Sequence, residues 1–389
     1  MFSILLLAFC VVANAQQYID LKSLKASNQP NTILATGNGS IYLSATSDLT
    51  TILDTIIFTS NGMTKSATDL LNTRLFQNSD LIQPWIVQGP VTVSTSASAD
   101  QISSLTGSIF LTTAKQATDT NFLVYDLKTE QTISTNAPQS TIVILNSQYA
   151  AVPYVSSTIS EWKQSMNQQV FLYRGVPDDN AEVANSAIFA NPFNTSDLSV
   201  QMTSVETFSL SLPIYYMRIY GGVSFKISRK YTNIGGNQFS NSLTTGFYMK
   251  SQTAGNVDLS LRPLTAQTSN MLGVNYIGNV PASGSVTVGV TLANGVSVQN
   301  QFSTAATQSM GWETNVGSPF TIKSTGAVGS EFYIQYYVRS GQSTTQSPAT
   351  DSPYKGTTPR PVVTTTSSAG ALQVTLSMIC SYFGYRLMQ

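Results

Sequence analysis

The chain has 389 residues, a formal net charge of zero and only 10% charged residues. It lacks the basic stripe that neutralises phosphates, which excludes nucleic acid as a partner. It has no histidine, and its two cysteines, Cys10 and Cys380, lie in apolar segments near the two ends. Imidazole bases, thiolate nucleophiles and the usual zinc ligands are therefore missing from the rest of the chain. We predict no catalytic residue, no cofactor and no metal site.

Residues 1–15 have the pattern of a secretory signal peptide. An apolar run ends at Ala13, Ala15 supplies a second small residue, and the polar pair Gln16–Gln17 follows. This spacing of small residues predicts cleavage after Ala15. We therefore expect the mature chain to be extracellular or on the outer face of the plasma membrane.

The C-terminal residues 371–389 form a second apolar segment, interrupted by polar residues such as Gln373 and Thr375. It is shorter than the roughly 20 apolar residues that a membrane-spanning helix needs. A removable GPI-anchor signal fits better, because Gly356–Thr358 offers a small-residue attachment site and 359–370 a polar spacer. The alternative is a disordered or core-packed C-terminus.

Residues 341–370 are dominated by serine, threonine and proline. Such a composition buries too little apolar area to offset the entropy of ordering, and O-glycosylated stalks have this composition. We expect a disordered stalk that holds a folded head away from a surface.

Short β-rich runs bounded by turn residues recur along the head. Several alternate apolar and polar residues with a period of two, as half-buried antiparallel strands do. The runs are Ser40–Ser44, Thr55–Phe58, Val91–Ser94, Ser108–Leu111, Phe122–Tyr125, Thr141–Leu145, Val170–Tyr173, Phe208–Leu212, Tyr215–Tyr220, Val223–Ile227, Val257–Leu261, Val286–Val290 and Phe332–Val338. The fold class is therefore all-β, with two antiparallel β-sandwich domains at 16–150 and 151–340.

Helical signals are sparse. Ser66–Asp69 resembles a capping box, and Ser157–Gln169, which contains Trp162, could form one helix. Thr55–Gly62 can also be laid beside Gln169–Gly175. The first runs on to the apolar strand Ser108–Leu111 and the second to Tyr215–Tyr220, which favours two related units.

The second of those segments carries a resemblance to a known family. Val170–Gly175, Ala187–Phe189 and Tyr215–Gly222 resemble the strand, loop and strand order of the CUB-like domains of nematode secreted proteins, although Arg174 stands where that pattern usually has aspartate. The resemblance implies a CUB-like jelly-roll at the cell surface, a role in innate immunity or stress response, and no catalytic residues. The chain departs from ordinary CUB domains in lacking their disulfide cysteines.

Two N-x-[ST] acceptors occur in the sequence. They are Asn38-Gly-Ser40 and Asn194-Thr-Ser196, both in turn-like sequence. In an exported chain such triplets indicate surface loops that carry glycan, so we predict glycosylation at Asn38 and Asn194.

Three further groups of residues could take part in binding or catalysis. Asp178, Asp179 and Glu182 form an acidic loop that could hold calcium, although a solvated turn is the ordinary explanation. Glu161 could pair with Asp126 or Glu206 for sugar hydrolysis, but no spacing signature sets these acids apart from others.

The third group is aromatic: Tyr215, Tyr216, Tyr220, Tyr333, Tyr336 and Tyr337. On a strand Tyr215 and Tyr216 must point to opposite faces, so we expect one of them to lie toward the core. Core packing is favoured over an aromatic platform for ligands.

The sequence thus predicts a non-catalytic extracellular or cell-surface glycoprotein that contacts other proteins or glycans through the loops of its sandwiches. It would meet a membrane only through the lipid anchor. Two alternatives remain open: a structural surface-coat protein without a specific ligand, and a carboxylate-based glycan-active enzyme. The sequence does not indicate the ligand or the oligomeric state.

Overall fold

A computed structural model of the chain describes residues 17–33, 38–46, 49–75, 79–147, 156–177, 187–194, 199–239, 243–264, 269–303 and 308–340. All of them belong to the first of two compact units, Met1–Lys355. The predicted leader (1–15), the acidic loop (178–182), the stalk (341–370) and the tail (371–389) lie outside the described residues, so what was expected of them stays a prediction.

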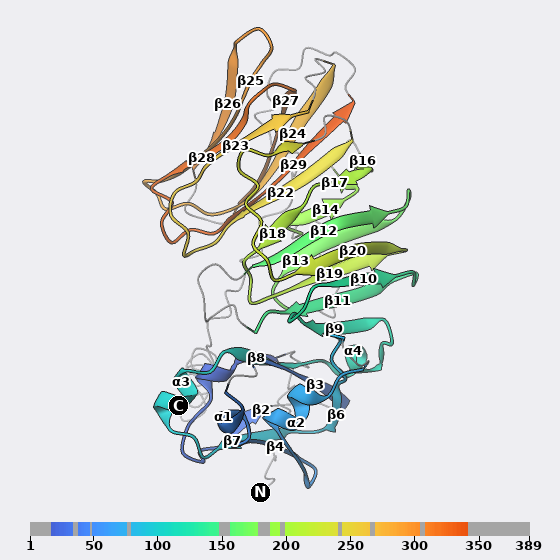
Figure 1. The fold of residues 1–389 in the computed structure, drawn as a ribbon, viewed down its shortest axis with the longest axis vertical. Helices are drawn as coiled ribbons and strands as arrows, with labels where there is room; N and C mark the ends of the chain where they lie inside the picture. Colours follow the sequence, from blue (N-terminus) through green and yellow to red (C-terminus); the bar gives the residue numbers. More distant parts are fainter. Residues whose placement is uncertain are drawn as a thin grey trace, which may run out of the picture. The chain divides into compact units, whose positions relative to one another are not determined.

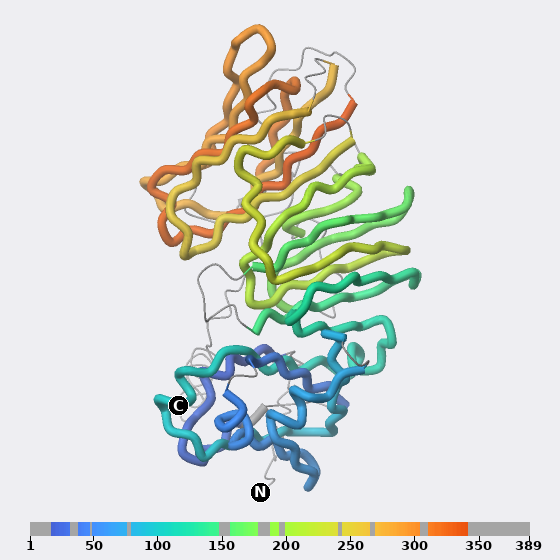
Figure 2. The backbone as a smooth tube through the Cα atoms, viewed as in Figure 1, coloured from blue at the N-terminus to red at the C-terminus, as the bar shows by residue number. Residues whose placement is uncertain are grey.

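The fold is all-β, as the sequence predicts. In the described residues, six sheets of four or five strands group into three pairs, which we call the first, second and third sandwiches (Figure 1). Figure 2 follows the chain through them in sequence order, from blue through green to orange. Three strand pairs are parallel (β9–β11, β17–β22 and β21–β23), and the other pairings between described strands are antiparallel.

The first sandwich has sheets of strand order β1-β8-β3-β6 and β2-β7-β4-β5. Their bounds are β1 Gln17–Asp20, β2 Asn31–Ile33, β3 Asn38–Ala45, β4 Ile56–Ser60, β5 Met63–Ser66, β6 Trp85–Gln88, β7 Val91–Thr95 and β8 Gly107–Leu111. Alternate side chains from both sheets, including Leu43, Phe58 and Ile109, pack into one fully buried core. This is the period-two pattern of half-buried strands.

Short helices connect these strands. They are η1 Leu21–Ser23, α1 Thr50–Leu53, α2 Ala67–Asn72, α3 Ala99–Ser103 and α4 Ala114–Thr118. The predicted capping box is confirmed, because Ser66 Oγ accepts from the Asp69 backbone N–H and the Asp69 carboxylate accepts from that of Ser66. Matching boxes start α3 and α4. Caps of this kind satisfy the free N–H groups that would otherwise disfavour so short a helix.

The second sandwich has a central sheet of strand order β14-β13-β19-β11-β9 and a second sheet of order β10-β20-β12-β18. Their bounds are β9 Phe122–Asp126, β10 Gln131–Thr135, β11 Ser140–Leu145, β12 Ser157–Gln164, β13 Gln169–Arg174, β14 Phe189–Asn191, β18 Phe208–Leu210, β19 Ile214–Tyr220 and β20 Val223–Ser228. A two-stranded ribbon, β15 Phe193–Asn194 and β16 Ser199–Val200, follows β14.

The central sheet is covered on both faces. One face, with Ile144, Leu172 and Met217, packs on the second sheet of its own sandwich. The other face packs with Tyr42 and Phe110, which project from the outer face of the first sandwich. Near-continuous apolar runs such as β11 are what a sheet buried on both faces requires.

The third sandwich has sheets of strand order β17-β22-β29-β24-β27 and β21-β23-β28-β25-β26. Their bounds are β17 Ser204–Val205, β21 Gln238–Phe239, β22 Thr244–Lys250, β23 Asp258–Pro263, β24 Asn270–Gly278, β25 Ser285–Thr291, β26 Ser297–Phe302, β27 Gln308–Asn315, β28 Phe320–Thr325 and β29 Phe332–Ser340. Side chains of both sheets, among them Leu272, Val288 and Ile334, form its core.

Two glycines let tyrosine rings lie flat across the first of these sheets. Tyr336 of β29 pairs with Gly246 of β22, and Tyr337 pairs with Gly273 of β24. A methyl group on Gly246 would lie 2.1 Å from Cζ of Tyr336, and one on Gly273 would lie 1.9 Å from Cζ of Tyr337. Each ring therefore occupies the space that a side chain would fill on the neighbouring strand.

The cores of the second and third sandwiches are continuous. Phe247 and Tyr333, from the third sandwich, pack within the core of the second. Gln335 also bonds to the edge strand β14: its Nε2 donates to Ala190 O (2.7 Å), and Ala190 N donates to its Oε1 (2.9 Å). The amide of Gln335 thus takes the place of a neighbouring strand along the edge of the central sheet.

The helix expected over Ser157–Gln169 is wrong. This segment forms β12, a turn and the start of β13, and β12 pairs with β18 and β20. The register shifts between Ser160 and Lys163, so two residues, Glu161 and Trp162, stand opposite Phe225 alone. This bulge interrupts the period-two alternation by which a strand is identified from sequence.

Two expectations about organisation also differ from the structure. The sequence predicts two sandwiches, whereas the described strands form three. The prediction is wrong on this number because the positions of strands along a sequence do not show which sheets pack together. The proposed repeat is not reproduced: β8 belongs to a different sheet from β4, whereas β19 pairs directly with β13. How the chain divides into folding domains is a separate matter, so the boundaries of 16–150 and 151–340 stay predictions.

Candidate functional site

The first predicted glycosylation site lies beside a sheet edge. Asn38 is the exposed first residue of β3, and its partner across the ladder is Gln88, the exposed last residue of the edge strand β6. Ile86 of β6 pairs with Ser40, so Asn38, Ile86 and Gln88 lie on one face of the sheet. We call these three residues the Asn38 surface.

The other residues of this acceptor triplet lie inside. Ser40 is fully buried, and its backbone N–H donates to Thr112 Oγ1 (2.9 Å). Its hydroxyl lies beside the Tyr42 phenol, where it lowers the pKa of Tyr42 against the larger upward shift from burial. The asparagine of the triplet therefore faces solvent while the serine hydroxyl lies inside.

The second predicted glycosylation site, Asn194, is the last residue of β15 and pairs with Ser199. Thr195 and Ser196 of its triplet lie outside the described residues. Glycosylation at Asn38 and Asn194 stays a prediction.

The tyrosine-rich strands are part of the core, as expected. Tyr215 and Tyr216 point to opposite faces of the central sheet, and both are buried because each face is covered. Tyr215 donates to Ser157 Oγ (2.7 Å), and burial raises the pKa of its phenol. Tyr333, Tyr336 and Tyr337 are also buried, so of these six tyrosines only Tyr220, 40% exposed, presents much of its ring to solvent.

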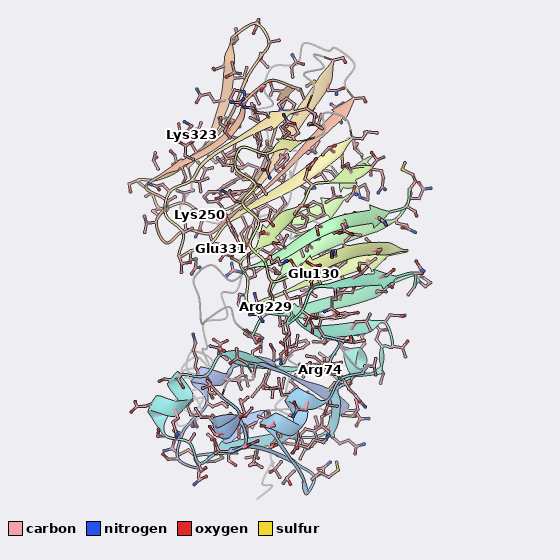
Figure 3. All side chains as sticks on the ribbon, in the orientation of Figure 1. Arg74, Glu130, Arg229, Lys250, Lys323 and Glu331 are labelled. Atoms are coloured by element: carbon pink, nitrogen blue, oxygen red, sulfur yellow. The ribbon has the colours of Figure 1, made fainter. Side chains whose placement is uncertain are left out.

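Asp126 joins the first sandwich to the central sheet. Its carboxylate is fully buried at the end of β9, where it accepts from Ser44 Oγ of β3 (2.6 Å) and from Arg74 Nη2 (2.8 Å), and Lys128 Nζ lies 3.2 Å away. Arg74 is labelled in Figure 3, next to the strands of the first sandwich. Two cations balance the charge of this carboxylate, and a hydroxyl donates a hydrogen bond to it. Such partners stabilise a buried charge within the fold.

A second ion cluster, in which Lys250 and Glu331 are buried and Arg174 is exposed, joins the central sheet to the third sandwich. Arg174 of β13 lies 3.0 Å from the Glu331 carboxylate, which also accepts from the Tyr333 hydroxyl. Lys250, 0% exposed, donates to Ser330 O (2.8 Å) and Ser251 O (3.1 Å), and it lies near Glu331 in Figure 3. Burial lowers the pKa of Lys250, and the charge of Glu331 acts against that shift.

Glu161 and Asp126, one of the two pairs suggested for sugar hydrolysis, do not share a site; Glu206, the other suggested partner, follows β17. Glu161 is exposed on β12 and pairs with Lys226, which also pairs with Glu130, whereas Asp126 is buried among its own partners in the other sheet. Among the residues that the structure places, no three acidic side chains gather closely enough to hold a metal ion.

The described helices are all short, and none could cross a membrane.

Comparison with known proteins identifies the family. A model of the transmembrane glycoprotein family matches residues 36–383 of the sequence. The chain belongs to this family. Membership supports a membrane-associated surface glycoprotein and accords with a chain that does no catalysis.

The other comparisons add nothing to this identification. No curated protein matches the chain. It is aligned with the VP2 subviral particle of infectious bursal disease virus at 7% identity and a TM-score of 0.11, over 82% of this chain and 70% of that one. A mutant VP2 of the same virus gives 8% identity and a TM-score of 0.09, over 83% and 67%. Scores this low do not indicate a shared fold.

Membership of the transmembrane glycoprotein family corrects the resemblance to nematode CUB-like domains, which is wrong. The residues that carried the likeness, Val170–Gly175 and Tyr215–Gly222, are two paired strands of the central sheet and the turns after them. A strand, loop and strand order of this kind recurs in many β proteins. The immune and stress roles depended on that likeness and lose their basis.

Sequence reasoning missed the residues that join the parts of this glycoprotein. The residues of the second ion cluster come from three different strands or their ends: Lys250, Glu331 and Arg174. Nothing in the sequence distinguishes Gln335 from other polar residues on strands. Ala190, which bonds to Gln335, and Arg174, which pairs with Glu331, lie 145 and 157 positions away in the chain, so no local spacing could have indicated these two contacts.

Proposed function

We propose that the chain is a surface glycoprotein that works by non-catalytic contact with extracellular proteins or glycans and carries sugar at Asn38 and Asn194. The match to the transmembrane glycoprotein family over residues 36–383 carries this proposal. The ionisable clusters support it, because Asp126, Glu331 and Lys250 are each held by structural partners.

The contact surfaces would be loops and sheet margins. The aromatic strands are buried in the cores, so they do not form a platform for ligands. Rigid sheets that display variable connections are a common way to build a recognition surface.

Contact can be tested with the purified full-length glycoprotein on a glycan array and on intact cells. We expect reproducible binding to a restricted set of glycans or to a protein on the cells. Uniform absence of binding on both would contradict a contact function and favour the coat alternative. Turnover of any arrayed glycan that a single carboxylate substitution abolishes would overturn the non-catalytic assignment.

We also propose that the C-terminal tail (371–389) is replaced by a lipid anchor. A phosphatidylinositol-specific phospholipase should then release the native protein from membranes, with detergent-extracted protein as the control for total yield. Protein that stays with the membrane after this treatment, and leaves only with detergent, would contradict the lipid anchor and assign attachment to the chain itself.

A further inference from the structure

The edge strand β6 is short and follows Pro84, but it has no charged residue of its own to oppose pairing with another chain. Its four residues, Trp85–Gln88, carry no charge, and β6 ends the sheet order β1-β8-β3-β6. Natural proteins usually protect such edges with charged residues, bulges or a covering segment, because an open edge is a template for another strand.

Apolar side chains flank this edge. Ile86 on β6 is 48% exposed, and Met63 on β5 is 56% exposed. The end of the β4–β5 hairpin meets β6, since Ser60, the partner of Met63 across the ladder, donates to Gln88 O (3.4 Å). Lys65 of β5 lies over the Trp85 ring, 5.8 Å from its centroid, and places one charge at the start of β6. Isolated exposed apolar residues need no explanation, but two that flank the rest of this edge favour association.

Asn38 stands beside Ile86 on the same face. Ser40 pairs with Ile86, and Asn38 is two residues before Ser40, so Asn38 and Ile86 are diagonal neighbours across β3 and β6. Diagonal neighbours in an antiparallel pair lie about 7–8 Å apart. A sugar on the Asn38 amide nitrogen would thus begin within one side-chain length of Ile86.

We propose that the glycan on Asn38 lies over Ile86 and the free edge of β6 and keeps this edge from pairing with a second copy of the chain. The proposal rests on the glycosylation proposed above. An N-linked glycan is bulky and hydrated, so it excludes an approaching strand while its first sugar covers the aliphatic side chain. The glycan thus prevents strand pairing at this edge, as charged residues do at other edges.

Two variants of the full chain, produced in glycosylating cells, remove this glycan differently. Asn38→Gln removes the acceptor nitrogen, and Ser40→Ala destroys the triplet while leaving Asn38 in place. Ser40→Ala removes only the hydroxyl that lies beside Tyr42, which is a smaller change than truncating a buried apolar side chain. Asn194→Gln is the matched control, since it removes the other predicted glycan.

Intact mass spectrometry measures occupancy, and light scattering after size exclusion measures association. We expect both Asn38→Gln and Ser40→Ala to lose one glycan mass and, with the edge uncovered, to associate at a concentration at least about tenfold lower than the parent protein. Asn194→Gln should lose its glycan and associate as the parent does. Adding Ile86→Lys to Ser40→Ala should reverse the association, because a lysine on the edge repels a second copy.

Failure of the shield and failure of the glycosylation are distinguishable. An unmodified Asn38 in the parent protein would contradict glycosylation at this site and the shield with it. An occupied Asn38 whose loss leaves association unchanged would overturn the shield alone. Association that Ile86→Lys does not reverse would overturn it too, because the second copy would then bind elsewhere.

Discussion

Replacing Asp126 with alanine is expected to lower the free energy of unfolding by about 3–5 kcal/mol, since breaking a buried ion pair from one side leaves the other charge uncompensated. The substitution removes the acceptor for Ser44 Oγ and leaves Arg74 and Lys128 without their counter-ion. Arg74 Nη1 is already buried without a partner, so the guanidinium has no alternative bond ready. Chemical denaturation of the purified full chain measures the loss.

Asp258→Ala is the matched control for Asp126→Ala. Asp258 and Lys323 are 3.5 Å apart and both more than half exposed, so their pair should contribute at most about 1 kcal/mol. Asp126→Asn, which keeps the shape and removes the charge, should fall between the two. Equal effects of Asp126→Ala and Asp258→Ala would show that Asp126 does not join the sandwiches as described.

Replacing Gly273 with alanine is expected to cost about 3 kcal/mol, from overpacking and from displacement of a buried ring. The added methyl group would meet Tyr337 Cζ at 1.9 Å and its hydroxyl at 2.2 Å. The ring cannot simply turn away, because it packs on Phe193 with ring centroids 4.3 Å apart. The midpoint of thermal or chemical unfolding should fall accordingly.

A double-mutant cycle distinguishes this clash from a loss of backbone freedom. In a Tyr337→Leu background, Gly273→Ala should cost much less, because the ring that it strikes is gone. Gly255→Ala provides the neutral comparison, since a methyl group added at Gly255 would meet nothing within 4 Å. An undiminished cost in the Tyr337→Leu background would mean that the ring is not the cause.

Local chemistry made much of this fold predictable. Each of the thirteen β-rich runs named from the sequence contains or overlaps a strand of the structure, because the runs are short, rich in β-branched and aromatic residues and bounded by turn residues. The capping box at Ser66 and Asp69 could also be predicted from the sequence, since its two hydrogen bonds join residues three positions apart.

Features that depend on contacts between distant residues, or on a strand whose alternation is interrupted, could not be predicted from the sequence. The bulge at Glu161 and Trp162 concealed β12, and the second covered face of the central sheet depends on Tyr42 and Phe110 from a different sandwich. Asn38 was predictable as an acceptor, but its position beside Ile86 depends on the pairing of Ser40 with Ile86, across 46 residues.

The continuous core of the second and third sandwiches sets how the molecule can be dissected. A fragment beginning at β21 would leave Phe247 and Tyr333 without the neighbours that cover them, and one ending at β20 would leave the β14 edge without Gln335. Fragments for binding maps, epitope mapping or crystallisation should therefore keep the second and third sandwiches together. They should keep the first sandwich as well, because it supplies Tyr42 and Phe110 to the central sheet and Arg74 to Asp126.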